Sequence, residues 1–394
     1  MSVPIYLDSH ATTFVEPRVL ESMLPFLREQ GGNPSNPEHH HGGAARDAVE
    51  QSRQSVAACL GCSSPEDILF TCGTTEANNL ALIGAYLQAA APEAHFISSV
   101  IEHASVQAPL EYLQSLGARV TWVPVDSEGR VNPADIQSAL RPETLMVSIM
   151  AANNEIGTIQ PLEEIGAICR AAKVLFHSDA AQFVGHEVLD VEKIQADLLT
   201  FSAHKFYGPK GVGALYRRTT PEAVRLRPVM HGGGQEGSLR SGTLNVAGIV
   251  GMATALRIGT EELAEENRRL MALATAIVAR LKQACPGLRL NGSTRHKLSR
   301  NISLTIPGVD SSALIQLLKD RISFSAGSAC SSAKPEPSHV LRAIGLSDEE
   351  CYQTIRLGLG RGVLAADVAD ILADGIAAAP IFSPSRNGWS GAMY

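Results

Sequence analysis

The stretch from residue 198 to residue 216, LLTFSAHKFYGPKGVGALY, contains two apolar runs separated by a polar segment rich in glycine. Leu198–Phe201 and Gly213–Tyr216 have the length and composition of buried β-strands. Lys205 follows the first strand, and a lysine that loses water at such a place becomes nucleophilic because its pKa falls. The stretch therefore predicts two strands with a reactive group between them.

The same alternation extends towards the N-terminus as far as Asp67. Short β-rich runs alternate with helical patterns, which is typical of a parallel sheet wrapped by helices. The other five expected strands are Ile68–Cys72, His95–Val100, Arg119–Val125, Thr144–Met150 and Val174–His177. The expected helices between them are Thr75–Ala91, Ala104–Leu116 and Leu162–Ala172. We therefore predict the α/β class, with a mainly parallel seven-stranded sheet.

The remainder of the chain predicts a smaller α+β domain. Glu261–Ala284 has its leucines and isoleucine close to one helical face, and a strand at Asn301–Ile306 and a helix at Ser311–Leu318 follow. We predict a large domain at 15–259 and a small domain formed by 1–14 with 260–381. Residues 382–394, rich in serine and glycine, are expected to form a weakly structured tail.

Composition excludes several classes of protein. The 394 residues include 33 Lys+Arg and 40 Asp+Glu, for a net charge of −7 without a basic block, which argues against direct nucleic-acid binding. Seven cysteines, an odd number, do not suggest a disulfide framework and favour a reducing compartment, the cytoplasm. No apolar run approaches the roughly 20 residues that a membrane-spanning helix needs, so we expect no membrane partner.

Polar side chains follow five of the seven predicted strands. Ligands of open α/β sheets bind outside the carboxyl ends of the strands, so these segments are expected to share one pocket. They are Gly73-Thr74-Thr75-Glu76, Glu102-His103, Asn153-Asn154-Glu155, Asp179-Ala180-Ala181-Gln182 and Ser202-Ala203-His204-Lys205.

The chemistry of these segments suits a pyridoxal phosphate site. Thr74 and Thr75 begin a helix, where N–H groups and hydroxyls can bind phosphate, although an ordinary helix cap gives the same pattern. Ser202 and His204 could complete the phosphate site. Asp179 could keep a pyridine nitrogen protonated beside Lys205, and His103 offers an aromatic ring.

Two residues of the small domain are further candidates. Cys330 lies in a loop of small residues beside Lys334, where a thiol can move and react, whereas Cys72, Cys169 and Cys351 are expected to be buried and inert. Arg356 lies in an apolar segment and needs a carboxylate, either in the protein or on a substrate. We expect no metal site, since the adjacent histidines His39-His40-His41 cannot all face one ion.

Taken together, these motifs resemble the cysteine desulfurases of the NifS/IscS type, in the class V aminotransferase group of pyridoxal-phosphate enzymes of fold type I. The cysteine loop distinguishes them from aminotransferases with the same lysine site. Ser9-His10 occupies the variable part of the N-terminal motif. The motifs that carry the resemblance are Leu7-Asp8-Ser9-His10-Ala11-Thr12-Thr13, Gly32-Asn33-Pro34-Ser35, Gly73-Thr74-Thr75-Glu76, Asn153-Asn154-Glu155-Ile156-Gly157, Ser178-Asp179-Ala180-Ala181-Gln182, His204-Lys205-Phe206-Tyr207-Gly208-Pro209-Lys210-Gly211, Arg240-Ser241-Gly242-Thr243 and Gly327-Ser328-Ala329-Cys330.

The resemblance implies a role for each candidate residue. Lys205 would hold pyridoxal 5′-phosphate covalently, with Asp179 on the pyridine nitrogen and Gln182 on the phenolic oxygen. His103 would stack on the ring and assist proton transfers. Thr74, Thr75, Ser202 and His204 would surround the phosphate, joined by Thr243 from a second subunit of a homodimer. Asn154 and Arg356 would hold the substrate carboxylate.

The implied reaction converts L-cysteine to L-alanine and leaves a persulfide on Cys330 for an acceptor protein. The acceptor could belong to iron-sulfur assembly, tRNA thiolation or the sulfur modification of DNA. A selenocysteine lyase or an aminotransferase for small amino acids could use the same lysine and aspartate, so both alternatives stay open.

Overall fold

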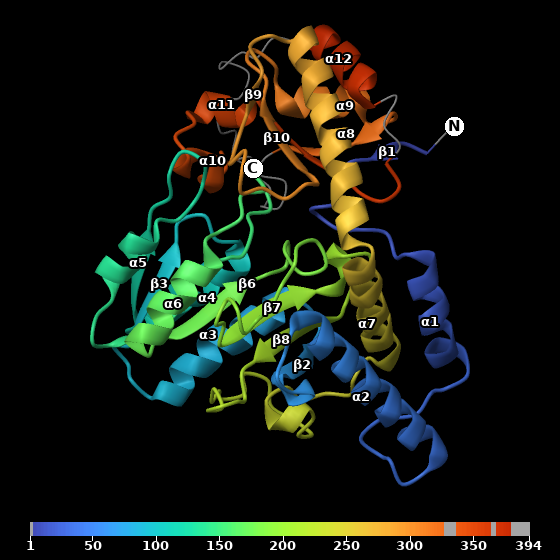
Figure 1. Cartoon of the computed structure of the whole chain (residues 1–394), viewed down its shortest axis with the longest axis vertical. Coiled ribbons are helices and arrows are strands. Elements are labelled where there is room, and N and C mark those ends of the chain that lie inside the picture. The colour runs from blue at the N-terminus through green and yellow to red at the C-terminus, as the bar shows by residue number, and fades with distance from the viewer. Residues whose placement is uncertain (1–2, 327–335, 364–367, 380–394) are drawn as a thin grey trace, which may run out of the picture.

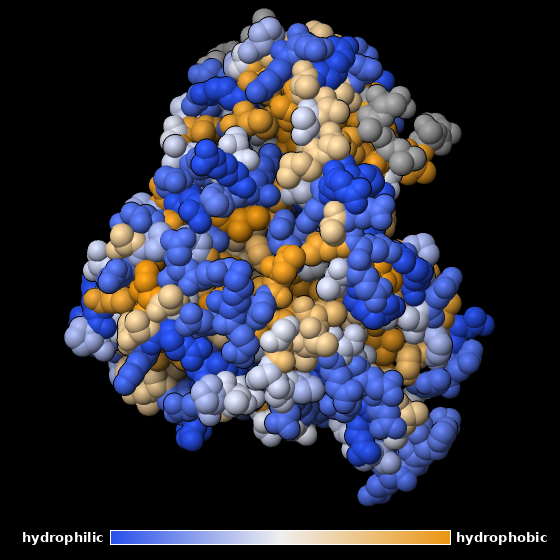
Figure 2. All heavy atoms as spheres, in the orientation of Figure 1, coloured by the Kyte–Doolittle hydropathy of each residue, from blue (hydrophilic) through white to orange (hydrophobic). Residues whose placement is uncertain are grey.

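The computed structural model describes residues 3–326, 336–363 and 368–379. Cys330 and the tail 382–394 lie outside the described residues. Figure 1 shows a lower part built around the large sheet and an upper part that contains the long C-terminal helices. Hydrophilic residues cover most of the face seen in Figure 2, while hydrophobic ones are visible where the two parts meet.

The large sheet has the seven predicted strands, each with its ends within two residues of the prediction. Its spatial order is β2-β8-β7-β6-β5-β3-β4, and β8 runs in the direction opposite to the other six strands. The expectation of a mainly parallel sheet is therefore confirmed. The strands are β2 (Ile68–Thr71), β3 (His95–Ser99), β4 (Arg119–Val123), β5 (Thr144–Ser148), β6 (Leu175–Asp179), β7 (Leu198–Ser202) and β8 (Gly213–Arg217).

Neighbouring residues of each central strand enter different hydrophobic clusters on the two faces of the sheet. Leu198 packs with the cluster of α3 and α4, whereas Leu199 packs with that of α2, α6 and α7. This is the result of the two-residue period of a strand, and it explains why the strands are apolar throughout. The helices are α2 (His40–Leu60), α3 (Thr74–Ala89), α4 (Ala104–Ser115), α6 (Leu162–Ala172) and α7 (Val246–Glu261).

Two further helices belong to the lower part of Figure 1, α1 (Pro17–Arg28) and α5 (Pro133–Ala139). His39, which precedes α2, accepts a hydrogen bond from the Gly42 amide through Nδ1 at 3.0 Å. This histidine therefore caps a helix. No helix within the described ranges is long and apolar enough to span a bilayer.

The upper part of Figure 1 contains a four-stranded antiparallel sheet with the order β12-β13-β10-β9. Its helices are α8 (Leu263–Ala284), α9 (Ser311–Leu318) and α12 (Val368–Ala378), with the shorter α10 (His339–Ala343) and α11 (Asp348–Tyr352) beside it. The strands are β9 (Arg289–Leu290), β10 (Asn301–Thr305), β12 (Ser325–Ala326) and β13 (Thr354–Gly358).

The N-terminal segment packs on this upper part. Strand β1 (Ile5–Tyr6) pairs in parallel with β11 (Ile322–Ser323), and Leu7 is buried in the cluster formed by α8, α9 and α12. The chain stays on the upper part as far as Ser9, whose amide donates to the Gly358 backbone oxygen, and residues 10–12 then line the cavity at the carboxyl edge of the large sheet. The domain bounds 15–259 and 260–381 stay a prediction; α7 runs through residue 259 without a break and ends at Glu261.

Candidate active site

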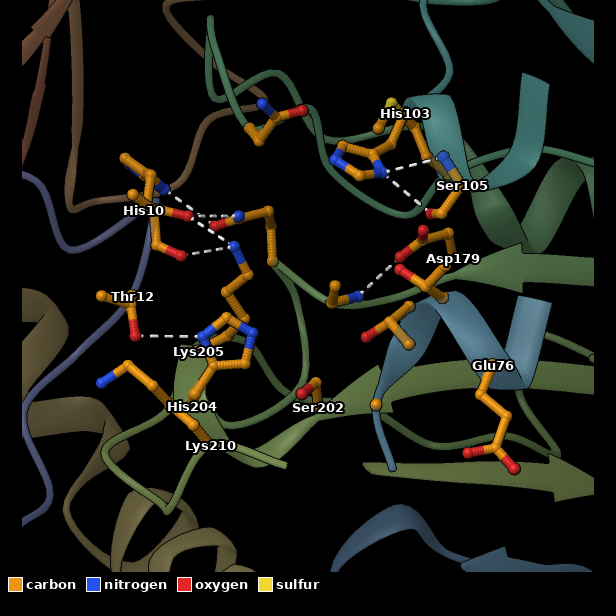
Figure 3. A pocket seen from close by; sticks show the side chains of 18 of the residues that line it. His10, Thr12, Glu76, His103, Ser105, Asp179, Ser202, His204, Lys205 and Lys210 are labelled. Carbon is orange, nitrogen blue, oxygen red and sulfur yellow. Dashed lines mark hydrogen bonds between the residues drawn. The ribbon is translucent and has the colours of Figure 1, made fainter. Parts of the chain in front are cut away.

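A cavity of about 530 Å³ lies at the carboxyl ends of the strands of the large sheet. As expected, the five polar segments after β2, β3, β5, β6 and β7 each contribute to its lining. Figure 3 shows these side chains converging, with Lys205 and His204 on one side and Asp179 and His103 on the other. The N-terminal segment 10–12 and Arg356 of β13 close the cavity from the upper part of the molecule.

Lys205 lies in a short 3-10 helix directly after β7. Its Nζ donates hydrogen bonds to the backbone oxygens of His10 at 2.8 Å and Ala11 at 2.9 Å. The backbone oxygen of Lys205 in turn accepts hydrogen bonds from His186 and from the buried Arg300. The lysine is therefore held at both ends while it lines the cavity.

Asp179 is the last residue of β6, and its buried carboxylate is fixed by neighbouring donors. Oδ2 accepts from Asn78 Nδ2 at 2.8 Å, and Oδ1 accepts from the Ala181 amide at 3.0 Å. Thr200 donates to Asn78 Oδ1 at 2.5 Å, which sets the orientation of the Asn78 amide. The carboxylate thus presents its oxygens to the cavity in one orientation.

His103 precedes α4 and caps it with its ring. Nδ1 accepts the Ser105 amide at 3.1 Å and lies 2.8 Å from Ser105 Oγ, which itself accepts from Asn78. A nitrogen that accepts a backbone N–H carries no hydrogen, so the ring hydrogen of neutral His103 is on Nε2. Burial lowers the pKa of His103. The charge of Asp179 raises this pKa, and the charge of Lys205 lowers it further, so the net shift is downward. His103 is therefore an N–H donor at neutral pH.

The start of α3 forms one wall of the cavity. Gly73 precedes the helix and has no side chain to cap it, so the first amides of α3 are open to a ligand. Thr74 Oγ1 is buried without a hydrogen-bond partner among the described residues. A Cβ on Gly213 would lie 2.7 Å from Gly73 Cα, so glycine is required where these two segments meet. This wall has the donors and the space that an anion needs.

Ser202 and His204 also line the cavity, and a Cβ on Gly73 would lie 3.7 Å from Ser202 Oγ. Ser202 Oγ donates to the Val212 backbone oxygen at 3.2 Å, and His204 Nδ1 lies 3.1 Å from Thr12 Oγ1. Burial, with Lys205 and Lys210 nearby, lowers the pKa of His204 to about 4. His204 is therefore neutral near pH 7 and can donate one N–H to a ligand.

Arg356 is fully buried and meets a carboxylate in the protein. Its Nη2 donates to Asp8 Oδ1 at 2.7 Å, and its Nη1 donates to the Asn154 backbone oxygen at 3.3 Å. Arg356 Nε has no partner among the described residues, and both Arg356 and Asn154 line the cavity. The protein ion pair is therefore present, and the guanidinium also faces the cavity.

Among the described residues, one predicted site residue does not line the cavity. Thr243 is exposed in the loop before α7 and does not contribute to the wall. Cys330 belongs to the segment 327–335, outside the described residues.

The prediction that Cys72 is buried was wrong. Cys72 is exposed and lines the cavity, because it follows the last residue of β2. Cys169 and Cys351 are buried, as expected.

Sequence reasoning missed three polar residues that shape the site: His10, Asn78 and Ser105. Asn78 is four residues after Thr74, so both lie on one face of α3, and this spacing could have identified it. His10 had no such signal, because its contact with Gln182 joins residues 172 positions apart.

Glu155 connects the cavity wall to the residues that follow segment 327–335. Its Oε2 accepts from Ser338 Oγ at 2.6 Å, and Ser338 Oγ accepts the amides of Val340 and Leu341 at the start of α10. Burial raises the pKa of the Glu155 carboxyl to about 7, against the lowering effects of Ser338 and Arg356. Glu155 is therefore protonated below pH 7 in the folded protein.

We expect Glu155→Gln to stabilise the protein at pH 8 and to leave it unchanged near pH 4.5. The pKa rises from 4.5 in the unfolded chain to about 7 in the folded one, so the folded state binds the extra proton between these values. The stability of the wild type then falls as the pH rises through this window. At 1.36 kcal/mol per unit of pKa shift, the loss is at most about 3 kcal/mol. Urea midpoints at pH 5, 6, 7 and 8 measure the difference.

Exposed Glu163, paired with Lys193 at the surface, provides the control. Glu163→Gln should change stability by less than about 0.5 kcal/mol at every pH. Equal urea midpoints for wild type and Glu155→Gln at pH 8 would contradict the role given to Glu155.

The family model for class-V aminotransferases matches residues 5–371. "Cysteine desulfurase IscS" of Anaeromyxobacter dehalogenans is 45% identical over 361 residues, 92% of this chain and 89% of that protein. A solved structure titled "NIFS-LIKE PROTEIN" is 38% identical with a TM-score of 0.88, and covers 95% of this chain and 99% of its own. Another, "SspA in complex with cysteine", is 35% identical with a TM-score of 0.79, covering 90% and 98%. The chain belongs to the class-V aminotransferase family of pyridoxal-phosphate enzymes, as a cysteine desulfurase.

Proposed function

We propose that the cavity binds pyridoxal 5′-phosphate and that the enzyme moves sulfur from L-cysteine to Cys330, releasing L-alanine. The observation that carries this proposal is the convergence of Lys205, Asp179 and the open start of α3 on one cavity. When bound, pyridoxal phosphate withdraws electrons from the substrate Cα, which allows the Cα proton and the sulfur to leave.

The residues present fit the cofactor at each of its polar groups. Asp179 supplies a buried carboxylate for the pyridine nitrogen, and Gln182 lines the cavity as a partner for the phenolic oxygen. Lys205 would hold the cofactor covalently, since its amine is the nucleophile in the cavity wall. His103 would lie against the ring.

The phosphate group fits the wall at the start of α3. Thr74 Oγ1 lacks a partner among the described residues, and a phosphate oxygen would accept its hydrogen. Thr75 and neutral His204 add further donors, and the Ser202 hydroxyl would add another by turning from the Val212 backbone oxygen to the phosphate. Because Thr243 is exposed and away from this wall, we propose that Thr243 of the partner subunit completes it in a homodimer.

The substrate carboxylate would bind between Asn154 and Arg356. Arg356 keeps one edge on Asp8 and also lines the cavity, so its guanidinium would accommodate a second carboxylate there. The relative solved in complex with cysteine supports L-cysteine as the substrate of this fold. The buried guanidinium would then orient the substrate Cα towards Lys205.

The protein's own groups divide the remaining work. Lys205 would remove the Cα proton, and His103, with its hydrogen on Nε2, would act as a donor. The Cys330 thiolate would attack the substrate sulfur, so that an S–S bond forms on Cys330 while the substrate C–S bond breaks. The electron pair of the C–S bond would stay on the substrate carbon, which is then protonated to give alanine. An acceptor protein in the cytoplasm would then take the sulfur.

The test adds pyridoxal phosphate to the purified protein and supplies L-cysteine. We expect an absorption band near visible wavelengths and alanine formation without any keto acid. A requirement for a keto acid would identify an aminotransferase, and alanine from L-selenocysteine but not L-cysteine would identify a lyase. Either result would overturn the proposal.

A further inference from the structure

His10 lies in the variable part of the N-terminal motif, yet its ring contacts Gln182, a residue of the cavity wall. The side chain lines the cavity and only 1% of the residue is exposed. Nδ1 lies 2.8 Å from Gln182 Oε1, and Nε2 lies 3.2 Å from Asn301 Nδ2. Figure 3 shows His10 beside the Lys205 amine. No step of the proposed reaction uses this ring.

The contacts around His10 allow one hydrogen arrangement. Burial, with Arg300 and Arg356 nearby, lowers the pKa of His10 well below 6.5, so the ring is neutral and has one N–H. Gln182 Nε2 donates to the His10 backbone oxygen at 2.9 Å, which leaves Oε1 facing the ring. The hydrogen is therefore on Nδ1, and Nε2 accepts from Asn301.

His10 thus holds the Gln182 amide at both of its ends. The ring donates to Oε1, and the backbone oxygen accepts one of the two Nε2 hydrogens. A half-turn of the amide would break both hydrogen bonds. The Gln182 NH₂ would then face the Nδ1–H of the ring, and Gln182 Oε1 would face the His10 backbone oxygen, and both contacts are repulsive. The second Nε2 hydrogen is left in a fixed direction in a residue that lines the cavity.

We propose that His10 is a positioning residue that fixes the Gln182 amide so that one Nε2–H is presented to the phenolic oxygen of bound pyridoxal phosphate. The inference rests on the proposed function, which gives Gln182 that partner. A donor that is already fixed loses no conformational entropy when the ligand binds. Removing the residue that fixes it should therefore weaken cofactor binding.

Matched substitutions separate this role from simple packing. In His10→Asn the side-chain NH₂ takes the place of Nδ1 and keeps the donation to Gln182, but the contact with Asn301 is lost. In His10→Gln the longer amide reaches the place of Nε2 and keeps Asn301, but not Gln182. His10→Ala loses both contacts, and Gln182→Ala removes the group that is positioned.

The measurement is the dissociation constant of pyridoxal phosphate for each variant. We expect His10→Asn to stay within about twofold of wild type, and His10→Gln, His10→Ala and Gln182→Ala each to bind about tenfold more weakly. The double variant of His10→Ala with Gln182→Ala should bind no more weakly than Gln182→Ala alone, because one interaction is being removed.

A second readout needs no cofactor. Nitrogen-15 NMR of the cofactor-free protein should show His10 as the Nδ1–H tautomer, and the Nε2–H tautomer would overturn the inference. So would additive losses in the double variant, or a loss in His10→Asn equal to that in His10→Ala. If wild type itself fails to bind pyridoxal phosphate while the tautomer is as expected, the proposed function is wrong, but the fixing of the Gln182 amide by His10 is supported.

Discussion

Replacing Lys205 with alanine is expected to lower alanine formation from L-cysteine by at least about a thousandfold, the upper range for losing a positioned acid or base. Lys205 is the lysine whose Nζ is held 2.8 Å and 2.9 Å from two backbone oxygens in the cavity wall. Its removal takes away both the group that would attach the cofactor and the base for the Cα proton. Alanine assays at saturating L-cysteine and pyridoxal phosphate measure the loss.

Lys210 provides a matched control for this variant. It lines the same cavity five residues later, but it is exposed. Lys210→Ala should therefore retain activity within about fivefold, since surface substitutions seldom disturb the fold. Borohydride reduction should fix the cofactor covalently to Lys205 in wild type and in Lys210→Ala. It should fix no cofactor in Lys205→Ala. Attachment at Lys210, or near-normal activity of Lys205→Ala, would show that the nucleophile has been misassigned.

The strands and the pocket at their ends could be predicted because both follow from local sequence. Apolar runs such as Leu198–Phe201 are buried on both faces, and parallel strands bring their carboxyl ends to one edge. Asp179 ends β6 and Lys205 follows β7, and because these two strands are neighbours in the sheet the two residues lie near each other. Only short-range patterns and general sheet geometry were needed for this part.

The residues that orient these groups could not be predicted in this way. His10 contacts Gln182 across 172 residues, and Asn301 contacts His10 across 291, so no local pattern reports either pair. Helix α7 was also missed. It is buried on nearly all sides and thus lacks the one-sided apolar pattern by which surface helices are recognised.

Cys330→Ser is expected to lower alanine formation at least about a hundredfold while the absorption band of the bound cofactor is retained. A serine hydroxyl is far less acidic than a thiol and cannot accept sulfur as a persulfide, so the substrate C–S bond lacks its attacking group. In wild type, a brief reaction with L-cysteine should add the mass of one sulfur atom to the Cys330 peptide.

The described residues on either side of segment 327–335 contact the cavity wall or its neighbours. Ser325 of β12 pairs with Arg356, which lines the cavity, and Ser338 is bonded to Glu155, which follows the cavity residue Asn154. Residues 325 and 338, on either side of the segment, therefore both lie beside the cavity wall.

Cys72→Ser is the matched control for the sulfur carrier, because Cys72 is the cysteine that lines the cavity among the described residues. Partial burial in the cavity wall, together with Glu76, raises the pKa of the Cys72 thiol, which keeps it protonated and a poor nucleophile. Cys72→Ser should therefore form alanine at close to the wild-type rate. If it lost activity while Cys330→Ser kept it, the sulfur would pass through Cys72, and the assignment based on the cysteine loop would be wrong.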